Sequence, residues 1–371
     1  MISVTDAELD DLRARLQATR WPTPWPLDGW EAGTDEHTLR RLVEYWATGY
    51  DWREHEEYIN GLPFASADID GTAVRYLRFD GEHPDSLPVI LTNGWPSSFL
   101  ELIGLAQRLA APSRHGGDPT TACTVIIPAL PGFPFSPQRP SLTDGPQTHE
   151  LWHRLMQAEL GFARYAAHGG DLGAGITSRL AEAHPEAVLG IHLMAVANPT
   201  TYDAESLTAE EKLYLASLDT WSVHEGGYQH QQSTRPLTLG YGLSDSPTGL
   251  LAWILEKYRA WSDCGGDVST RFSDDFLLTQ ASLYWFTRTI STSFRPYYEY
   301  AAGMTRRVER VTVPTALALF PADLSHPPRS WAERVYRVTR YTPMPRGGHF
   351  AAYEEPDLLA SDILEFLHTL R

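Results

Sequence analysis

The feature that most constrains this chain is an aspartate set among glycines, in the segment Gly169-Gly170-Asp171-Leu172-Gly173. The segment follows an apolar stretch at residues 163–168, and its pattern is typical of a sharp turn from a buried strand into a helix. Glycines are needed in such a turn because the strand and helix backbones approach each other closely. The sequence therefore predicts that the turn lifts the Asp171 side chain above the edge of a parallel sheet.

A carboxylate in this position favours a chemistry different from that of the serine more often found there. Its attack on an acyl carbon would give only an exchangeable anhydride. Its attack on an sp³ carbon that carries a leaving group gives an ester, which water then hydrolyses. Asp171 therefore indicates epoxides or alkyl halides as substrates. Taken alone, Asp171 is more simply a helix N-cap, so the interpretation depends on the residues that accompany it.

Composition narrows the class of protein and its partners. The chain has 371 residues, 42% of them hydrophobic, and a formal net charge of −17. This acidity argues against nucleic acid and anionic membrane surfaces as partners. The two cysteines, Cys123 and Cys264, form no disulfide framework and fit a reducing compartment. We expect neither metal nor cofactor, because no metal-ligand spacing or phosphate-binding glycine pattern is present.

The start of the chain carries no signal peptide pattern, and no apolar run approaches the roughly 18 residues of a membrane span. We therefore expect a cytoplasmic protein without a membrane anchor.

Short apolar runs separated by helical periodicity predict an α/β fold with a mostly parallel sheet and helices on both faces. The predicted strands lie at residues 74–79, 88–91, 123–127, 188–196 and 315–320. The predicted helices between them lie at residues 100–110, 148–159 and 175–183.

The pattern divides the chain into four segments. Residues 1–70 form an N-terminal extension that wraps the core, with a capping box at Thr5 and Glu8 and a second amphipathic helix near residues 36–48. Residues 71–199 form the first part of the core and residues 304–371 the second, which ends in a helix opened by Pro356. Residues 200–303, rich in Trp, Tyr and Gln, predict a helical lid over the carboxyl ends of the strands.

An acid and a histidine follow the lid in the order that an α/β-hydrolase requires after its nucleophile. Asp323 follows one apolar strand, and His349 follows the next. Singly, each has a simpler interpretation, a turn residue for Asp323 and a loop histidine for His349. Glu354 and Glu355 are rival acids, but their place at a helix start is explained by capping.

Two further groups complete the candidate site. The turn Asn93-Gly94-Trp95-Pro96 follows the strand at 88–91, where an oxyanion turn belongs, so the backbone N–H groups of Trp95 and Leu172 are candidate donors. Tyr228 and Tyr297 in the lid could hold and protonate an epoxide oxygen. Spacing alone does not select these two among the 17 tyrosines.

The chain resembles the microsomal-type epoxide hydrolases, which are α/β-hydrolases with an N-terminal extension and a helical lid. The motifs that carry the resemblance run nearly end to end: Tyr50-Asp51-Trp52-Arg53 with Asn60, Leu130-Pro131-Gly132-Phe133, Asp245-Ser246-Pro247-Thr248-Gly249-Leu250, Ala252-Trp253-Ile254, Glu256-Lys257 and Arg346-Gly347-Gly348-His349-Phe350-Ala351-Ala352.

The resemblance implies a role for each candidate residue. It implies Asp171 as nucleophile, Asp323 as acid, His349 as base, Tyr228 and Tyr297 as the pair that activates the epoxide, and Trp95 in the oxyanion turn. It implies no cofactor.

Two positions depart from the family pattern, Asn93 where a histidine is usual and Leu172 where a tryptophan is usual. The Leu172 N–H remains available, but loss of the indole should reshape the pocket floor and alter substrate choice.

The resulting hypothesis is an enzyme that opens an apolar or aromatic epoxide to a vicinal diol, with water as the second substrate. Family members in detoxification and in bacterial secondary metabolism provide the biological setting that the resemblance implies. One alternative is a haloalkane dehalogenase, against which the absence of an indole at Leu172 argues. Another is an α/β-hydrolase relative that binds a ligand without catalysis. The sequence leaves a homodimer open.

Overall fold

The computed structural model describes residues 2–27 and 29–370, and an eight-stranded sheet forms its centre. The strand order is β1-β2-β4-β3-β5-β6-β7-β8. The strands are β1 (Phe64–Ile69), β2 (Thr72–Phe79), β3 (Leu87–Thr92), β4 (Cys123–Pro128), β5 (Tyr165–Gly169), β6 (Val188–Leu193), β7 (Val311–Leu319) and β8 (Tyr336–Pro343).

The sheet is parallel from β4 to β8, and β1 and β2 form an antiparallel edge. The buried central strands are the continuous apolar runs of the sequence, as expected for strands covered on both faces. The predicted α/β-hydrolase fold with a mostly parallel sheet is therefore confirmed.

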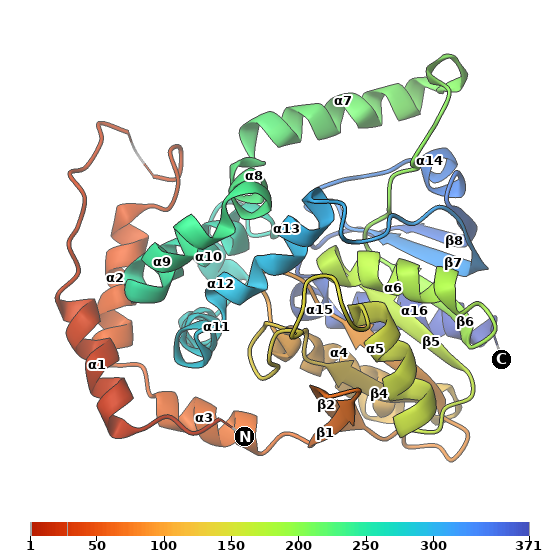
Figure 1. Cartoon of the computed structure of the whole chain (residues 1–371), viewed down its shortest axis with the longest axis horizontal. Helices are drawn as coiled ribbons and strands as arrows, with labels where there is room; N and C mark the ends of the chain where they lie inside the picture. The colour runs from red at the N-terminus through yellow and green to blue at the C-terminus, as the bar shows by residue number, and fades with distance from the viewer. Residues whose placement is uncertain (1, 28, 371) are drawn as a thin grey trace.

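Helices cover both faces of this sheet (Figure 1). Helices α5 and α6 pack together on one face, and α4 and α16 pack together on the other. The helices that flank the sheet are α4 (Ile103–Ala110), α5 (Thr148–Arg154), α6 (Asp171–Ala183), α14 (Arg329–Glu333), α15 (Ala351–Glu354) and α16 (Pro356–His368).

A helical segment is inserted between β6 and β7, and it lies beside the carboxyl ends of the parallel strands (Figure 1). Its helices are α7 (Ala209–His224), α8 (Gly227–Thr234), α9 (Pro236–Asp245), α10 (Pro247–Ala260), α11 (Asp274–Thr287), α12 (Ile290–Ser293) and α13 (Arg295–Ala301). None of the helices in the described parts of the chain is long and apolar enough to cross a membrane.

The chain begins with three helices, α1 (Asp6–Gln17), α2 (Glu36–Thr48) and α3 (Trp52–Asn60). They contact α10 and α11 of the insertion, on the side of the molecule away from β8 (Figure 1). The capping box predicted at Thr5 and Glu8 is present, and the leucines of α1 at the predicted helical spacing are buried.

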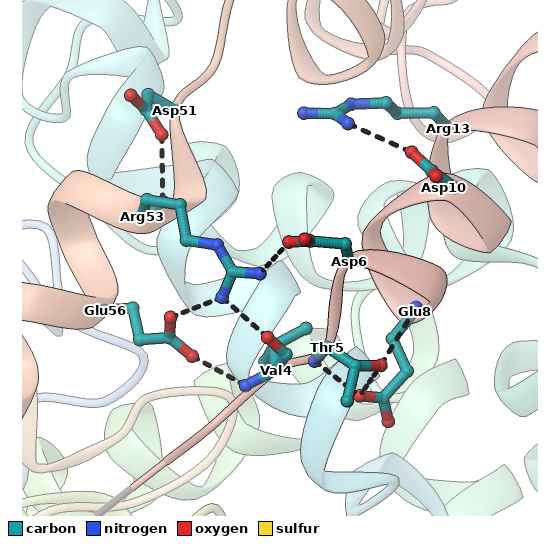
Figure 2. A network of polar contacts seen from close by, with 9 residues as sticks. All are labelled: Val4, Thr5, Asp6, Glu8, Asp10, Arg13, Asp51, Arg53 and Glu56. Carbon is teal, nitrogen blue, oxygen red and sulfur yellow. Dashed lines mark hydrogen bonds and ion pairs between the residues drawn. The ribbon is translucent and has the colours of Figure 1, made fainter.

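Two residues of the first family motif hold the start of the chain against α3. Figure 2 shows the Arg53 guanidinium beside the Glu56 carboxylate and the Val4 carbonyl oxygen, each 2.6 Å away. The backbone N–H of Val4 in turn donates to Glu56. Asn60 binds both the backbone N–H and the carbonyl oxygen of Ile2, at 2.9 and 2.8 Å. This motif is therefore a clamp on the first residues of the chain.

Some elements differ from the sequence prediction. Strand β1 lies at Phe64–Ile69, before the expected start of the sheet near residue 70, and it pairs with β2. Helix α3 was not predicted as a helix. Helix α6 begins at Asp171 itself, and the helix predicted over residues 148–159 ends in a π-helical turn at Leu155–Glu159. The division of the chain into four segments stays a prediction.

Candidate active site

The turn between β5 and α6 places Asp171 at the sheet edge in a strained backbone conformation. Its φ angle is 49°, in the left-handed region that few residues other than glycine adopt. A Cβ atom at Gly173 would lie 2.0 Å from the carbonyl oxygen of Thr92 at the end of β3. Glycine at position 173 is therefore required for α6 to start directly against β3.

Three side chains that follow β5, β7 and β8 meet in one row, which is joined by a hydrogen bond and an ion pair. The Nε2 atom of His349 lies 3.4 Å from Oδ2 of Asp171, and its Nδ1 atom lies 2.6 Å from Oδ1 of Asp323. The Asp323 carboxylate also accepts the backbone N–H of Leu324 at 2.7 Å. Since a carboxylate only accepts, Nδ1 of His349 carries a proton and Nε2 faces Asp171.

Opposing effects act on the charge of His349. Burial lowers its pKa, but the negative charges of Asp323 and Asp171 outweigh burial and hold the pKa well above its ordinary value. The backbone N–H of His349 is fixed by the Trp261 carbonyl oxygen at 2.7 Å. The imidazolium is thus favoured while both carboxylates carry charge.

The turn after β3 brings a backbone donor to Asp171. The N–H of Trp95 donates to Oδ1 of Asp171 at 2.9 Å. A Cβ atom at Gly94 would lie 2.2 Å from the same oxygen, so glycine is needed beside Trp95. Leu172 stands in the first turn of α6, where backbone N–H groups have no partner within the helix. Both candidate oxyanion donors are therefore next to the Asp171 carboxylate in the chain or in space.

Tyr228 on α8 and Tyr297 on α13 come together around the Trp95 ring. The Tyr228 ring stacks on Trp95 with a centroid distance of 5.4 Å, and the Tyr297 ring meets it edge-on at 6.2 Å. Burial, followed by the negative charge of Asp171, raises the pKa of both phenols well above the ordinary value. The hydroxyl group of Tyr297 is buried without a hydrogen-bond partner among the described residues. Both phenols thus stay protonated as donors.

These groups surround a cavity of about 440 Å³ under the inserted helices. Its lining includes the side chains of the row and both tyrosines, together with apolar residues. The apolar part of the lining includes Phe133, Leu172, Ile176, Val196 and Trp221. Leu172, one of the two departures from the family pattern, is thus part of the cavity wall.

A second, much smaller cavity of about 10 Å³ lies behind Asp171 and His349. This volume suits about one water molecule. Asn93 lines the cavity, and its Nδ2 donates to the carbonyl oxygens of Gly94 and Ser97. Its Oδ1 is buried without a partner among the described residues. Asn93 therefore presents a free acceptor close to the reactive carboxylate.

Glu101 also lines the small cavity, and the sequence interpretation missed it. Burial raises the pKa of Glu101 to about 7. The signal was available in part, because Glu101 belongs to the turn Phe99–Leu102 that opens α4 immediately after the oxyanion turn. Burial of an acid on a largely apolar helix face cannot be read from spacing.

Within residues 2–27 and 29–370, no group of three or more His, Cys, Asp or Glu side chains could hold a metal ion. Glu354 accepts backbone N–H groups of Asp263 and Phe350, and the acid in contact with His349 is Asp323.

An eight-stranded sheet with this strand order, a carboxylate at the β5–α6 turn, and an acid and a histidine after β7 and β8 define an α/β-hydrolase with an aspartate in the nucleophile position. The family model for the epoxide hydrolase N terminus matches residues 1–102, and the α/β hydrolase fold model matches residues 88–222.

Individual relatives specify the family. A putative epoxide hydrolase of Stigmatella aurantiaca is 40% identical over 100% of this chain and 84% of its own length. Epoxide hydrolase 1 of Oryctolagus cuniculus is 32% identical over 99% of this chain and 87% of its own length. The chain belongs to the epoxide hydrolases, a family of enzymes, and the comparisons do not favour a dehalogenase or a non-catalytic relative.

Solved structures agree with this assignment. The epoxide hydrolase of Aspergillus niger superposes with a TM-score of 0.86 at 30% identity, covering 100% of this chain and 96% of the other. The juvenile hormone epoxide hydrolase of Bombyx mori superposes with a TM-score of 0.87 at 27% identity, covering 100% and 93%.

Proposed function

We propose that the protein opens an apolar or aromatic epoxide to a vicinal diol through an ester on Asp171, with His349 and Asp323 as base and orienting acid. The observation that carries the proposal is the arrangement of the Asp171 carboxylate. Its Oδ1 is held by the Trp95 N–H, while its Oδ2 faces His349, in a cavity that both tyrosines also line.

In the first step, Tyr228 and Tyr297 hold the epoxide oxygen. A carboxylate oxygen of Asp171 forms a bond to a ring carbon, and the carbon–oxygen bond of the ring breaks. The alkoxide takes a proton from one phenol. The high pKa of the buried phenols keeps them protonated in the free protein, as this step requires.

Ester formation changes the charge around His349. Asp171 loses its negative charge when it is alkylated, so one of the causes that raise the pKa of His349 disappears. The imidazole then gives up its proton more readily and can act as a base at Nε2. In this scheme the first step itself prepares His349 for the second.

In the second step, His349 removes a proton from a water molecule held near Asn93, and the oxygen of that water attacks the ester carbon of Asp171. The N–H groups of Trp95 and Leu172 bind the oxyanion. Collapse breaks the bond between the ester oxygen and the carboxyl carbon and restores the Asp171 carboxylate. The two protons of the water end on the departing diol oxygen and on the tyrosine phenolate.

The test follows one oxygen atom. In a single turnover in oxygen-18 water, the first diol should contain only unlabelled oxygen, because its new oxygen comes from Asp171. Label in that first diol would contradict the ester path. Mass spectrometry of a His349→Ala variant should show Asp171 alkylated, and an Asp171→Asn variant is expected to form no adduct.

A further inference from the structure

Helix α6 carries a second cavity residue on the same face as Asp171. Asp171, Gly175 and Arg179 are spaced by four residues and therefore lie one above another on the helix. All three line the large cavity. The Arg179 side chain folds back over Gly175, with its Nη atoms 3.5 and 3.6 Å from where a Cβ at Gly175 would stand. The missing side chain at Gly175 thus leaves room for the guanidinium beside the cavity.

Arg179 has neither a hydrogen-bond nor an ion-pair partner among the described residues, and the carboxylate that acts on its charge is Glu182, which does not line the cavity. The arginine is partly buried. The carboxylates nearby are already engaged, and Glu182 accepts the backbone N–H groups of Glu309 and Arg310. Glu299 is bound by Arg139 and Arg295, and Asp323 is bound by His349. A guanidinium has five N–H donors, so this one is available to a bound molecule.

A second group at the same end of the cavity has one ring nitrogen without a partner. His149 on α5 lines the cavity, and its Nδ1 atom is buried with no hydrogen-bond partner among the described residues. Burial, and then the charge of Arg179, lowers the pKa of His149 to about 4. At neutral pH the imidazole is therefore uncharged. Its Nε2 lies 3.4 Å from the Glu150 carboxylate, which holds the ring proton at that nitrogen, so His149 adds no competing charge beside Arg179.

We infer that Arg179, beside the uncharged ring of His149, forms a subsite for a carboxylate carried by the epoxide substrate. The inference rests on the proposed function and narrows its substrate class to epoxides with an apolar body and an anionic group. The eight residues from Asp171 to Arg179 span about 12 Å along the helix axis. The arginine side chain leans back toward the start of the helix, so the remaining gap is about the width of an aromatic ring.

Styrene oxide and its meta- and para-carboxylates are matched probes, because they differ only in the charged group. The protein should hydrolyse at least one carboxylate with a higher kcat/KM than styrene oxide. In Arg179→Met this preference should fall by about tenfold or more, while styrene oxide changes by about twofold or less. Arg179→Lys should retain part of the preference. Arg337→Met, which removes an exposed arginine of β8 that does not line the cavity, should leave the preference unchanged.

The outcomes separate the two proposals. Turnover of styrene oxide by Arg179→Met shows that this variant is folded and that the epoxide chemistry is intact. An unchanged carboxylate preference in that variant would overturn the subsite and leave the proposed function standing. Failure of the parent on all epoxides would overturn the proposed function itself. Independently of any variant, the carboxylated diol should inhibit the parent at a lower concentration than phenylethanediol, and equal inhibition would contradict the subsite.

Discussion

The Nε2 atom of His349 lies 3.4 Å from Oδ2 of Asp171, so the side chains proposed as base and nucleophile form an ion pair in the free protein. This contact adds to the pairing of His349 with Asp323 and helps to hold the imidazole in its charged form. In the proposed reaction, alkylation removes the negative charge of Asp171. The same contact explains why this loss would lower the pKa of His349.

Replacing Asp171 by Asn should lower the pKa of His349, because one of the charges that stabilises the imidazolium is removed. The raised pKa stabilises the fold below the ordinary histidine pKa of about 6.5, and this stabilisation is lost as pH rises through the folded value. A nitrogen-15 NMR titration of the ring should show a lower pKa in Asp171→Asn than in the parent. An Asp357→Asn variant, which changes an exposed carboxylate, should titrate like the parent, and equal values in all three would contradict the ion pair.

Removing either phenol should slow ring opening. Tyr228→Phe and Tyr297→Phe keep the ring that packs on Trp95 but remove the proton donor, and loss of a general acid costs about 10²–10⁴ in rate. Rapid-quench measurement of ester formation should show the loss in each variant. Tyr298→Phe, next to Tyr297 but much more exposed, is the control and should behave as the parent.

Asn93 should act on ester hydrolysis alone. In Asn93→Ala the free acceptor in the small cavity disappears, so the ester on Asp171 should persist longer while its formation keeps its rate. Rapid-quench mass spectrometry would show a larger steady-state fraction of alkylated protein. Asn93→His, which restores the residue usual in the family, should hydrolyse the ester faster than Asn93→Ala. Equal slowing of both steps in Asn93→Ala would instead indicate a distorted oxyanion turn.

Glu101 should make the fold sensitive to pH near neutrality. Its pKa is about 7 in the fold and 4.5 for an unperturbed glutamate, so the folded form binds the proton more tightly between these values. Stability therefore falls as pH rises from about 4.5 to about 7, by roughly 3 kcal/mol in full. Urea unfolding should show this fall in the parent and a flatter profile in Glu101→Gln. Parallel profiles would contradict the burial of an ionisable carboxyl.

Gly173→Ala should disrupt the turn that carries Asp171. The added Cβ would meet a backbone oxygen of β3 at 2.0 Å, and a backbone atom cannot move aside as a side chain can. We expect a loss of several kcal/mol in unfolding free energy, about the upper range for single substitutions. Gly104→Ala on α4 is the matched control, because its Cβ would meet only the end of Arg108 at 3.7 Å, and it should be neutral or slightly stabilising.

The sequence predicted the candidate site best where a local motif and the order of motifs along the chain pointed to the same residues. The glycines around Asp171 reveal a tight turn, and the acid and histidine follow strands that the apolar runs define. Strand β1 was missed because it is short and mostly not buried, and α3 was missed because only two of its residues are buried. Both elements do carry a local pattern, an amphipathic face in α3 and alternating burial in β1, but each is short.

Other parts of the site depend on packing that spacing cannot show. Tyr228 and Tyr297 were selected by resemblance, since nothing in the spacing of tyrosines distinguishes them. The burial of Glu101 and the lack of a hydrogen-bond partner for Arg179 depend on residues that only the fold brings near them. The closed environment that shifts the pKa of Glu101 is assembled from several distant segments of the chain.

Trp95 connects the two halves of the proposed reaction within one residue. Its backbone N–H holds the carboxylate proposed as nucleophile, and its ring packs against both phenols proposed to hold the epoxide. A change of side chain at this position would shift the proton donors and the oxyanion donor together. Adaptation to a new substrate would therefore proceed through other walls of the cavity, since this residue links the groups proposed for ring opening to those proposed for ester hydrolysis.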